Sequence, residues 1–167
     1  MLHTSRISKV VVGAAAVLAS ASAANMAAIP STDPLLRLAG RWTGDAVMTS
    51  MSGAPENFKC VVTYLAVRDG SGMKQTLRCK GATIKLEAAT LLQVNGKTVT
   101  GQWEDKINSL AGNVRGEVME DGFEVMLGGP FFRAKMAVAG PECAQQVTVS
   151  PERSSYSRQL SAALRMC

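Results

Sequence analysis

The feature that most constrains the fold is a succession of short segments in which apolar and polar residues alternate, each ended by a turn signal. In the segment 41–49, one face carries Trp42, Gly44, Ala46 and Met48. Because side chains of a strand point alternately to its two faces, this pattern predicts a half-buried β-strand. Turn signals such as Asn95-Gly96 and Asp121-Gly122 separate the segments, and their regular spacing is typical of a sandwich or barrel.

We therefore expect strands near 41–49, 58–67, 73–80, 82–94, 97–104, 113–119, 123–127, 132–138, 145–150 and 156–165. Residues 84–92 are the one place where a helix competes, since Leu, Ala, Glu and Lys favour it. The Asn95-Gly96 turn that follows needs strands on both sides, so we predict a strand there. Short turns and no long crossover predict an all-β fold, a single antiparallel up-and-down barrel of about 8–10 strands.

The first 23 residues have the features of a secretory signal peptide. Arg6 and Lys9 precede a short apolar run over 10–18, and Ala21-Ser22-Ala23 is a small-residue cleavage site. The apolar run is well below the ~20 residues that a membrane-spanning helix needs. We expect a cleaved signal peptide at 1–23, a mobile lead-in at 24–37 and a barrel domain at 38–167. The protein would then be periplasmic or secreted, with no transmembrane span.

The composition argues against most kinds of catalytic, metal-binding and nucleic-acid-binding site. The one histidine, His3, would leave with the signal peptide, which excludes imidazole-based triads and His-ligated haem or zinc sites. Glu104 and Asp105 are adjacent on a predicted strand and point to opposite faces, so they cannot share a site. Scattered Lys and Arg with few aromatics predict no nucleic-acid partner. We expect a monomer that is not an enzyme and has no metal site or cofactor.

Four cysteines in an exported chain predict disulfides. Cys60 and Cys79 lie symmetrically about the Asp69-Gly70 turn, and directly opposed residues of a hairpin are close enough for a disulfide. The midpoint between Cys143 and Cys167 is Ser155, which lies in the polar segment 151–155, so each pair would join the strands of one hairpin. Close C-x-x-C pairs, which are typical of zinc and redox sites, do not occur in the sequence.

The segment Leu38-x-Gly40-x-Trp42-x-Gly44 resembles the first strand of lipocalin-like (calycin) barrels. The resemblance implies that Gly lets the backbone bend and that Trp42 packs across the barrel base. It also implies that an Arg from a late strand, here Arg158 or Arg165, stacks on that indole. Further motifs are similar to a group of uncharacterised small periplasmic proteins of Gram-negative bacteria, among them Phe58-x-Cys60-x-Val62-x-Tyr64, Gln75-x-Leu77-Arg78-Cys79 and Gly101-x-Trp103-Glu104. This second resemblance implies the fold and the compartment, but no activity.

Small and large residues share the predicted inward faces. This pattern fits two kinds of barrel interior, one that is tightly packed and one that is hollow enough for a ligand. The small ones are Gly44, Ala46, Gly101, Gly116 and Ala134. If the barrel is hollow, it would hold a small apolar molecule, lined by Trp42, Gly44, Ala46, Trp103, Phe132 and Met136. The alternative is an envelope-associated structural or inhibitor protein that contacts an envelope protein through its outer surface.

Overall fold

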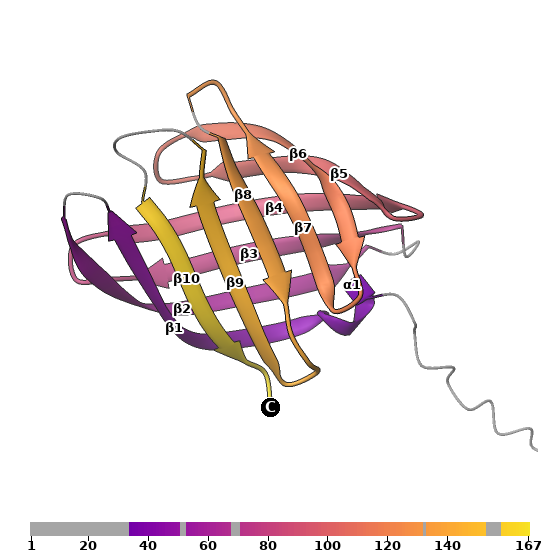
Figure 1. The fold of residues 1–167 in the computed structure, drawn as a ribbon, viewed down its shortest axis with the longest axis horizontal. Coiled ribbons are helices and arrows are strands. Elements are labelled where there is room, and N and C mark those ends of the chain that lie inside the picture. Colours follow the sequence, from indigo (N-terminus) through magenta and orange to yellow (C-terminus); the bar gives the residue numbers. More distant parts are fainter. Residues whose placement is uncertain (1–33, 51–52, 68–70, 132, 153–157) are drawn as a thin grey trace, which may run out of the picture.

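A closed barrel of ten antiparallel strands makes up almost all of the described structure. The computed structural model describes residues 34–50, 53–67, 71–131, 133–152 and 158–167. Each strand pairs with its neighbours in sequence, and β1 pairs with β10 to close the wall (Figure 1). A short helix precedes the strands, and the elements are α1 (Pro34–Arg37), β1 (Gly40–Ser50), β2 (Gly53–Ala66), β3 (Gly72–Lys80), β4 (Lys85–Asn95), β5 (Thr98–Asp105), β6 (Leu110–Met119), β7 (Gly122–Gly128), β8 (Arg133–Ala139), β9 (Ala144–Pro151) and β10 (Arg158–Arg165).

The predicted all-β, up-and-down barrel is confirmed, including a strand at the segment where a helix competes. Residues 85–95 form β4, and Val94 and Asn95 pair with Val99 and Thr98 across a tight turn. Gly96 in this turn has a φ of 61°, a left-handed conformation that glycine adopts without steric cost. The turn therefore fixes the register of β4 on β5, and the helix propensity of residues 84–92 is overridden.

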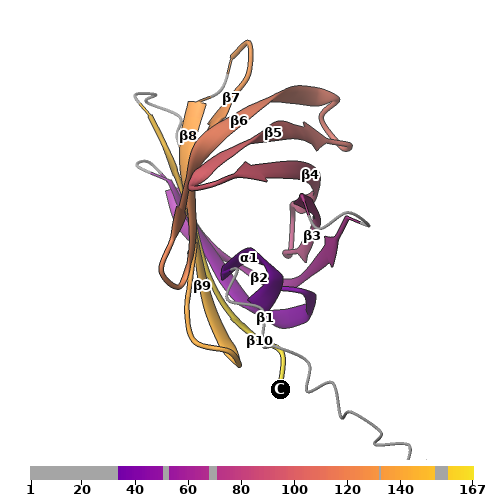
Figure 2. The same cartoon turned by 90° about the vertical axis from the view of Figure 1, so that its right-hand side faces the viewer.

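One end of the barrel is closed by α1 and the residues that follow it (Figure 2). Leu35 and Leu38 are buried, with 2% and 4% of their surface exposed. The Trp42 indole is also buried, and its Nε1 donates a hydrogen bond to the Leu38 carbonyl oxygen at 2.8 Å. This bond joins the indole to the segment just before β1, so Trp42 lies at the floor of the barrel, as the sequence motif predicts.

Neither β10 arginine stacks on Trp42 as the resemblance implies. Arg165 is exposed on the outer face, opposite Thr43, and Arg158 lies opposite Ser50 at the other end of β1. Arg37 of α1 lines the same small pocket as Trp42 instead. Its guanidinium donates to the Glu120 carbonyl oxygen at 2.5 Å, which ties α1 to the β6–β7 turn. The expectation fails because the alternation of β10 points Arg165 away from the interior.

Both predicted disulfides are present. Cys60 and Cys79 face each other in the register of β2 and β3, with their Cα atoms 4.1 Å apart. Cys143 precedes β9 and Cys167 follows β10, and their Cα atoms are 5.3 Å apart. Each disulfide thus connects the two strands of one hairpin, and the second one also holds the C-terminal end of the chain against the barrel.

The inward-facing glycines allow neighbouring strands to approach closely. A Cβ atom at Gly44 would collide with the carbonyl oxygen of Ala163 on β10. A Cβ atom at Gly101 would likewise collide with the carbonyl oxygen of Leu91 on β4, and one at Gly116 with that of Glu124 on β7. These three glycines therefore serve backbone packing, as expected where one strand bends closely onto another. They do not by themselves outline a cavity.

We predict that Gly44→Ala destabilises the barrel by about 1–3 kcal/mol, because the added methyl group must displace the backbone of β10. Gly128→Ala is the matched control, since the nearest atom to its added Cβ is the Asn113 carbonyl oxygen at 3.9 Å. Urea unfolding followed by tryptophan fluorescence measures both. Equal stability of the two variants would show that β1 and β10 can move apart to accommodate a methyl group at position 44 without loss of stability.

Candidate ligand-binding interior

The two halves of the barrel interior differ in how completely their side chains are buried. In the half next to α1, the inward-facing Tyr64, Met73, Leu92, Val99 and Phe123 have at most 1% of their surface exposed. In the other half, some inward-facing apolar side chains, such as Phe58 and Met136, are buried, but five are only partly buried, namely Met48, Leu77, Leu86, Ala88 and Val149. These partly buried side chains lie toward the end of the barrel opposite α1. We call this half the open half.

The predicted lining residues are spread along the whole interior. Trp42 lies at the floor, whereas Gly44 and Ala46 follow it up the inner face of β1. Met136 lies on the opposite wall, where β8 pairs with β7 and β9. Phe132 lies outside the described residues. The structure thus places the described ones on the inner wall without gathering them at one point, and their role in ligand binding stays a prediction.

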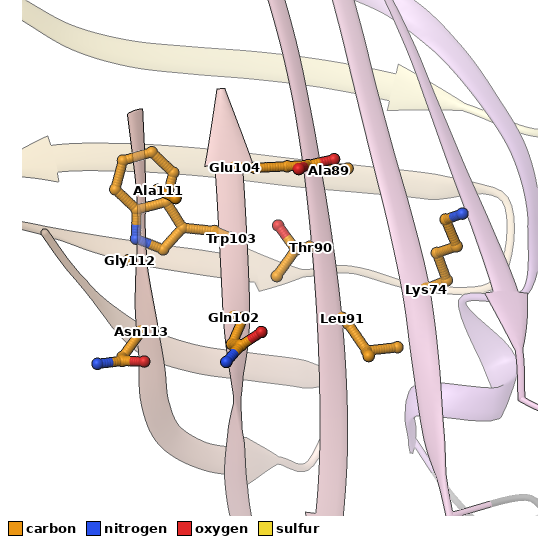
Figure 3. A pocket seen from close by; sticks show the side chains of 10 residues that line it. All are labelled: Lys74, Ala89, Thr90, Leu91, Gln102, Trp103, Glu104, Ala111, Gly112 and Asn113. Atoms are coloured by element: carbon orange, nitrogen blue, oxygen red, sulfur yellow. The ribbon is translucent and has the colours of Figure 1, made fainter. Parts of the chain in front are cut away.

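Trp103 is part of the wall near the open end. Its indole extends over Gly112, the residue directly opposite on β6, and Nε1 donates to the Gly128 carbonyl oxygen at 3.1 Å (Figure 3). A Cβ at Gly112 would lie 2.7 Å from Trp103 Nε1, so this position needs a glycine. The indole thereby connects β5, β6 and β7 near the end of the barrel opposite α1.

A groove of about 720 Å³ lies over strands β3 to β6 (Figure 3). It is lined mainly by residues that the alternation places on the outer face, namely Lys74, Ala89, Leu91, Gln102, Glu104, Ala111 and Asn113. A second hollow of about 580 Å³, over β5 to β8, shares Asn113 with it and adds Arg115, Met126 and Arg133. We call the two together the outer groove. It was not predicted, although Ala89 and Ala111 among larger outward-facing residues are the signal that could have indicated it.

A polar cluster lies inside the half of the barrel next to α1, which we call the closed half. Tyr64 and Gln75 face each other on β2 and β3, and Gln145 reaches them from β9. The Gln75 amide nitrogen donates to the Tyr64 hydroxyl at 3.3 Å, and this hydroxyl donates to Gln145 Oε1 at 3.1 Å. Burial raises the pKa of the Tyr64 phenol well above its usual value, so the hydroxyl stays protonated. Polar residues at inward positions of the alternation were the signal for this cluster, which the sequence reasoning missed.

Glu56 organises the rim of the open end. Its carboxylate accepts hydrogen bonds from the backbone N–H groups of Thr83 and Ile84 at 2.9 and 3.1 Å, and from the Thr83 hydroxyl. The Thr83 backbone hydrogen bond is the main cause that lowers the pKa of Glu56, and the positive charge of Arg158 lowers it further. Glu56 therefore connects the start of β2 to the turn between β3 and β4.

We predict that Glu56→Gln lowers the urea midpoint of unfolding at pH 7, because the charged acceptor is lost. The folded-state pKa of Glu56 lies below the ordinary 4.5, so its stabilisation is present above that value and is lost as the pH falls through the folded-state pKa. The difference between wild type and variant should thus shrink at pH 2–3. A difference that stays the same at both pH values would contradict the role of the carboxylate charge.

Within the described ranges, the structure shows no group of three or more His, Cys, Asp or Glu side chains arranged to hold a metal ion. In the same residues, no helix is both long and apolar enough to cross a membrane.

The fold and the interior define a lipocalin-like antiparallel barrel. No protein family and no curated protein matches the sequence. Among solved structures, the chain is similar to the S-type phycobiliprotein lyase CPES from Guillardia theta, with a TM-score of 0.56, 8% identity, and coverage of 80% of this chain and 90% of the lyase. It is also similar to Rv2717c from M. tuberculosis, with a TM-score of 0.64, 13% identity, and coverage of 83% of this chain and 98% of that protein. At these identities, the likeness shows the fold alone.

The match to a lyase corrects one expectation from the sequence. The absence of histidine-based and carboxylate-pair motifs led us to expect that the protein is not an enzyme. The Guillardia theta protein, which has a similar barrel, is named a phycobiliprotein lyase, so the expectation is contradicted. The reasoning failed because it considered only motifs in the sequence, whereas a barrel places residues from many strands around one interior.

Proposed function

We propose that this protein binds a small apolar molecule in the open half of its barrel. The observation that carries the proposal is the partial exposure of inward-facing apolar side chains, such as Leu77, Leu86 and Val149, inside a closed wall. A ligand that covers these side chains removes their apolar surface from water, which is favourable by roughly 25 cal/mol per Å². Trp103 and Met136 border the same space, so they are the predicted lining residues best placed to contact it.

The proposal includes a periplasmic or secreted location. Two disulfides support it, because such bonds persist in oxidising compartments. The signal-like sequence of residues 1–23 supports it as well. In that location, a barrel that shields an apolar molecule from water would serve as its carrier or as the place where it is processed.

A second candidate function uses the outer face. The outer groove combines the half-exposed Leu91 with polar side chains such as Lys74 and Gln102, a mixture typical of protein interfaces. An envelope protein with an extended segment could lie in this groove. This candidate keeps the predicted envelope partner and assigns its contact to the outer face of β3–β8.

Neighbouring alanines on β4 separate the two functions. Ala88 faces the interior and pairs with Leu77, whereas Ala89 faces the outer groove and pairs with Glu104. We predict that Ala88→Phe weakens the binding of a neutral apolar dye by about tenfold or more, because the ring fills the space that the dye needs. Ala89→Phe should leave dye affinity unchanged. Titrations by fluorescence, with circular dichroism to confirm folding, measure both.

The opposite pattern would overturn the assignment. Weaker dye binding in Ala89→Phe alone would place the ligand in the outer groove. If wild-type protein binds no neutral apolar dye and carries no extra mass in native mass spectrometry after purification from its own cells, ligand binding in the barrel is refuted.

A further inference from the structure

We propose that the buried amide of Gln145 recognises the ligand by donating a hydrogen bond to an uncharged oxygen, such as a ketone or ester carbonyl. The inference rests on the proposed function and specifies the ligand class. The amide nitrogen of Gln145, Nε2, is buried and has no hydrogen-bond partner among the described residues. A buried amide donor without a partner is costly, so it is a strong candidate for a ligand contact.

The hydrogen bonds around Tyr64 fix which end of the Gln145 amide is available. The Tyr64 hydroxyl accepts from Gln75 Nε2 and donates to Gln145 Oε1. While Gln75 donates to this hydroxyl, reversing the Gln145 amide alone would give the hydroxyl two donors and no acceptor for its own proton. Since the raised pKa of Tyr64 keeps the phenol protonated, this arrangement leaves the Gln145 amide nitrogen as the donor without a partner.

The cluster adjoins the open half. Leu77 is the next inward-facing position after Gln75 on β3, and it is partly exposed. On β9, Val147 follows Gln145 on the inner face and Val149 is again partly exposed. A ligand in the open half that extends one layer further in would therefore reach the cluster. Its apolar part would contact Leu77 and Val149, and its innermost atom would meet the Gln145 amide.

The surroundings select a neutral acceptor over a carboxylate. Among the described residues, the buried polar side chains are Gln75, Thr90 and Gln145, and none carries a charge. A carboxylate at this depth would be buried without a positive partner, which is far more costly than burying a carbonyl group. The interior thus favours an apolar molecule with an uncharged oxygen at one end.

The test compares two ligands of nearly equal shape, undecan-2-one and undecane, by equilibrium uptake from the vapour headspace. The wild type should hold the ketone in preference to the alkane. In Gln145→Leu this preference, the ratio of the two dissociation constants, should fall by about tenfold while alkane binding persists. The control is Gln146→Leu, since Gln146 is the exposed neighbour on the outer face of β9 and its loss should leave the ratio unchanged.

A second measurement does not depend on a variant that folds. In a ¹H–¹⁵N spectrum of the wild type, the side-chain amide signals of Gln145 should shift with undecan-2-one and stay nearly in place with undecane. An unchanged ratio in folded Gln145→Leu, or equal signal shifts with both ligands, would overturn the proposal and leave ligand binding intact. If the wild type takes up neither ligand, the proposed function itself fails.

Discussion

The pairing of β1 with β10 is the interaction on which the rest of the structure depends. It joins the first and last strands over eight residue pairs, from Thr43–Arg165 to Ser50–Arg158. Without it, the sheet would have two free edges with unpaired N–H and C=O groups, which are prone to pair with other chains. Closure also forces the backbones together at Gly44, where only a residue without a side chain fits.

In the part of the chain that the structure describes, the strands form a closed wall, so the proposed binding depends on what covers each end of the barrel. At one end, α1 and Leu38 pack on Trp42 and exclude water. At the other end, Glu56 holds the rim in shape through the Thr83 backbone, while apolar side chains further in remain partly exposed. This asymmetry, rather than any single motif, is the physical support for the ligand binding that we propose.

The interior is not uniformly apolar, and three of its polar side chains, Tyr64, Gln75 and Gln145, are connected by hydrogen bonds. Tyr64 reaches from β2 to Gln145 on β9, strands that are separated in the wall by β1 and β10. In the binding mode that we propose, this bond across the interior would limit how deep a ligand enters and would present a donor at that depth. A purely apolar interior would bind apolar molecules with little discrimination, whereas a buried polar group rejects those that leave it unpaired.

Local patterns in the sequence determined the strands, their alternation and both disulfides, because these depend on neighbouring residues and on short turns with few allowed geometries. The position of Trp42 at the floor also followed from its motif. The sequence alone could not show that Gly101 and Gly116 serve backbone contact, or that Tyr64, Gln75 and Gln145 meet. Those facts depend on how strongly the sheet bends and on which strands face each other across the barrel. Only closure of the sheet sets that geometry, since it brings together residues whose separation along the chain carries no local signal.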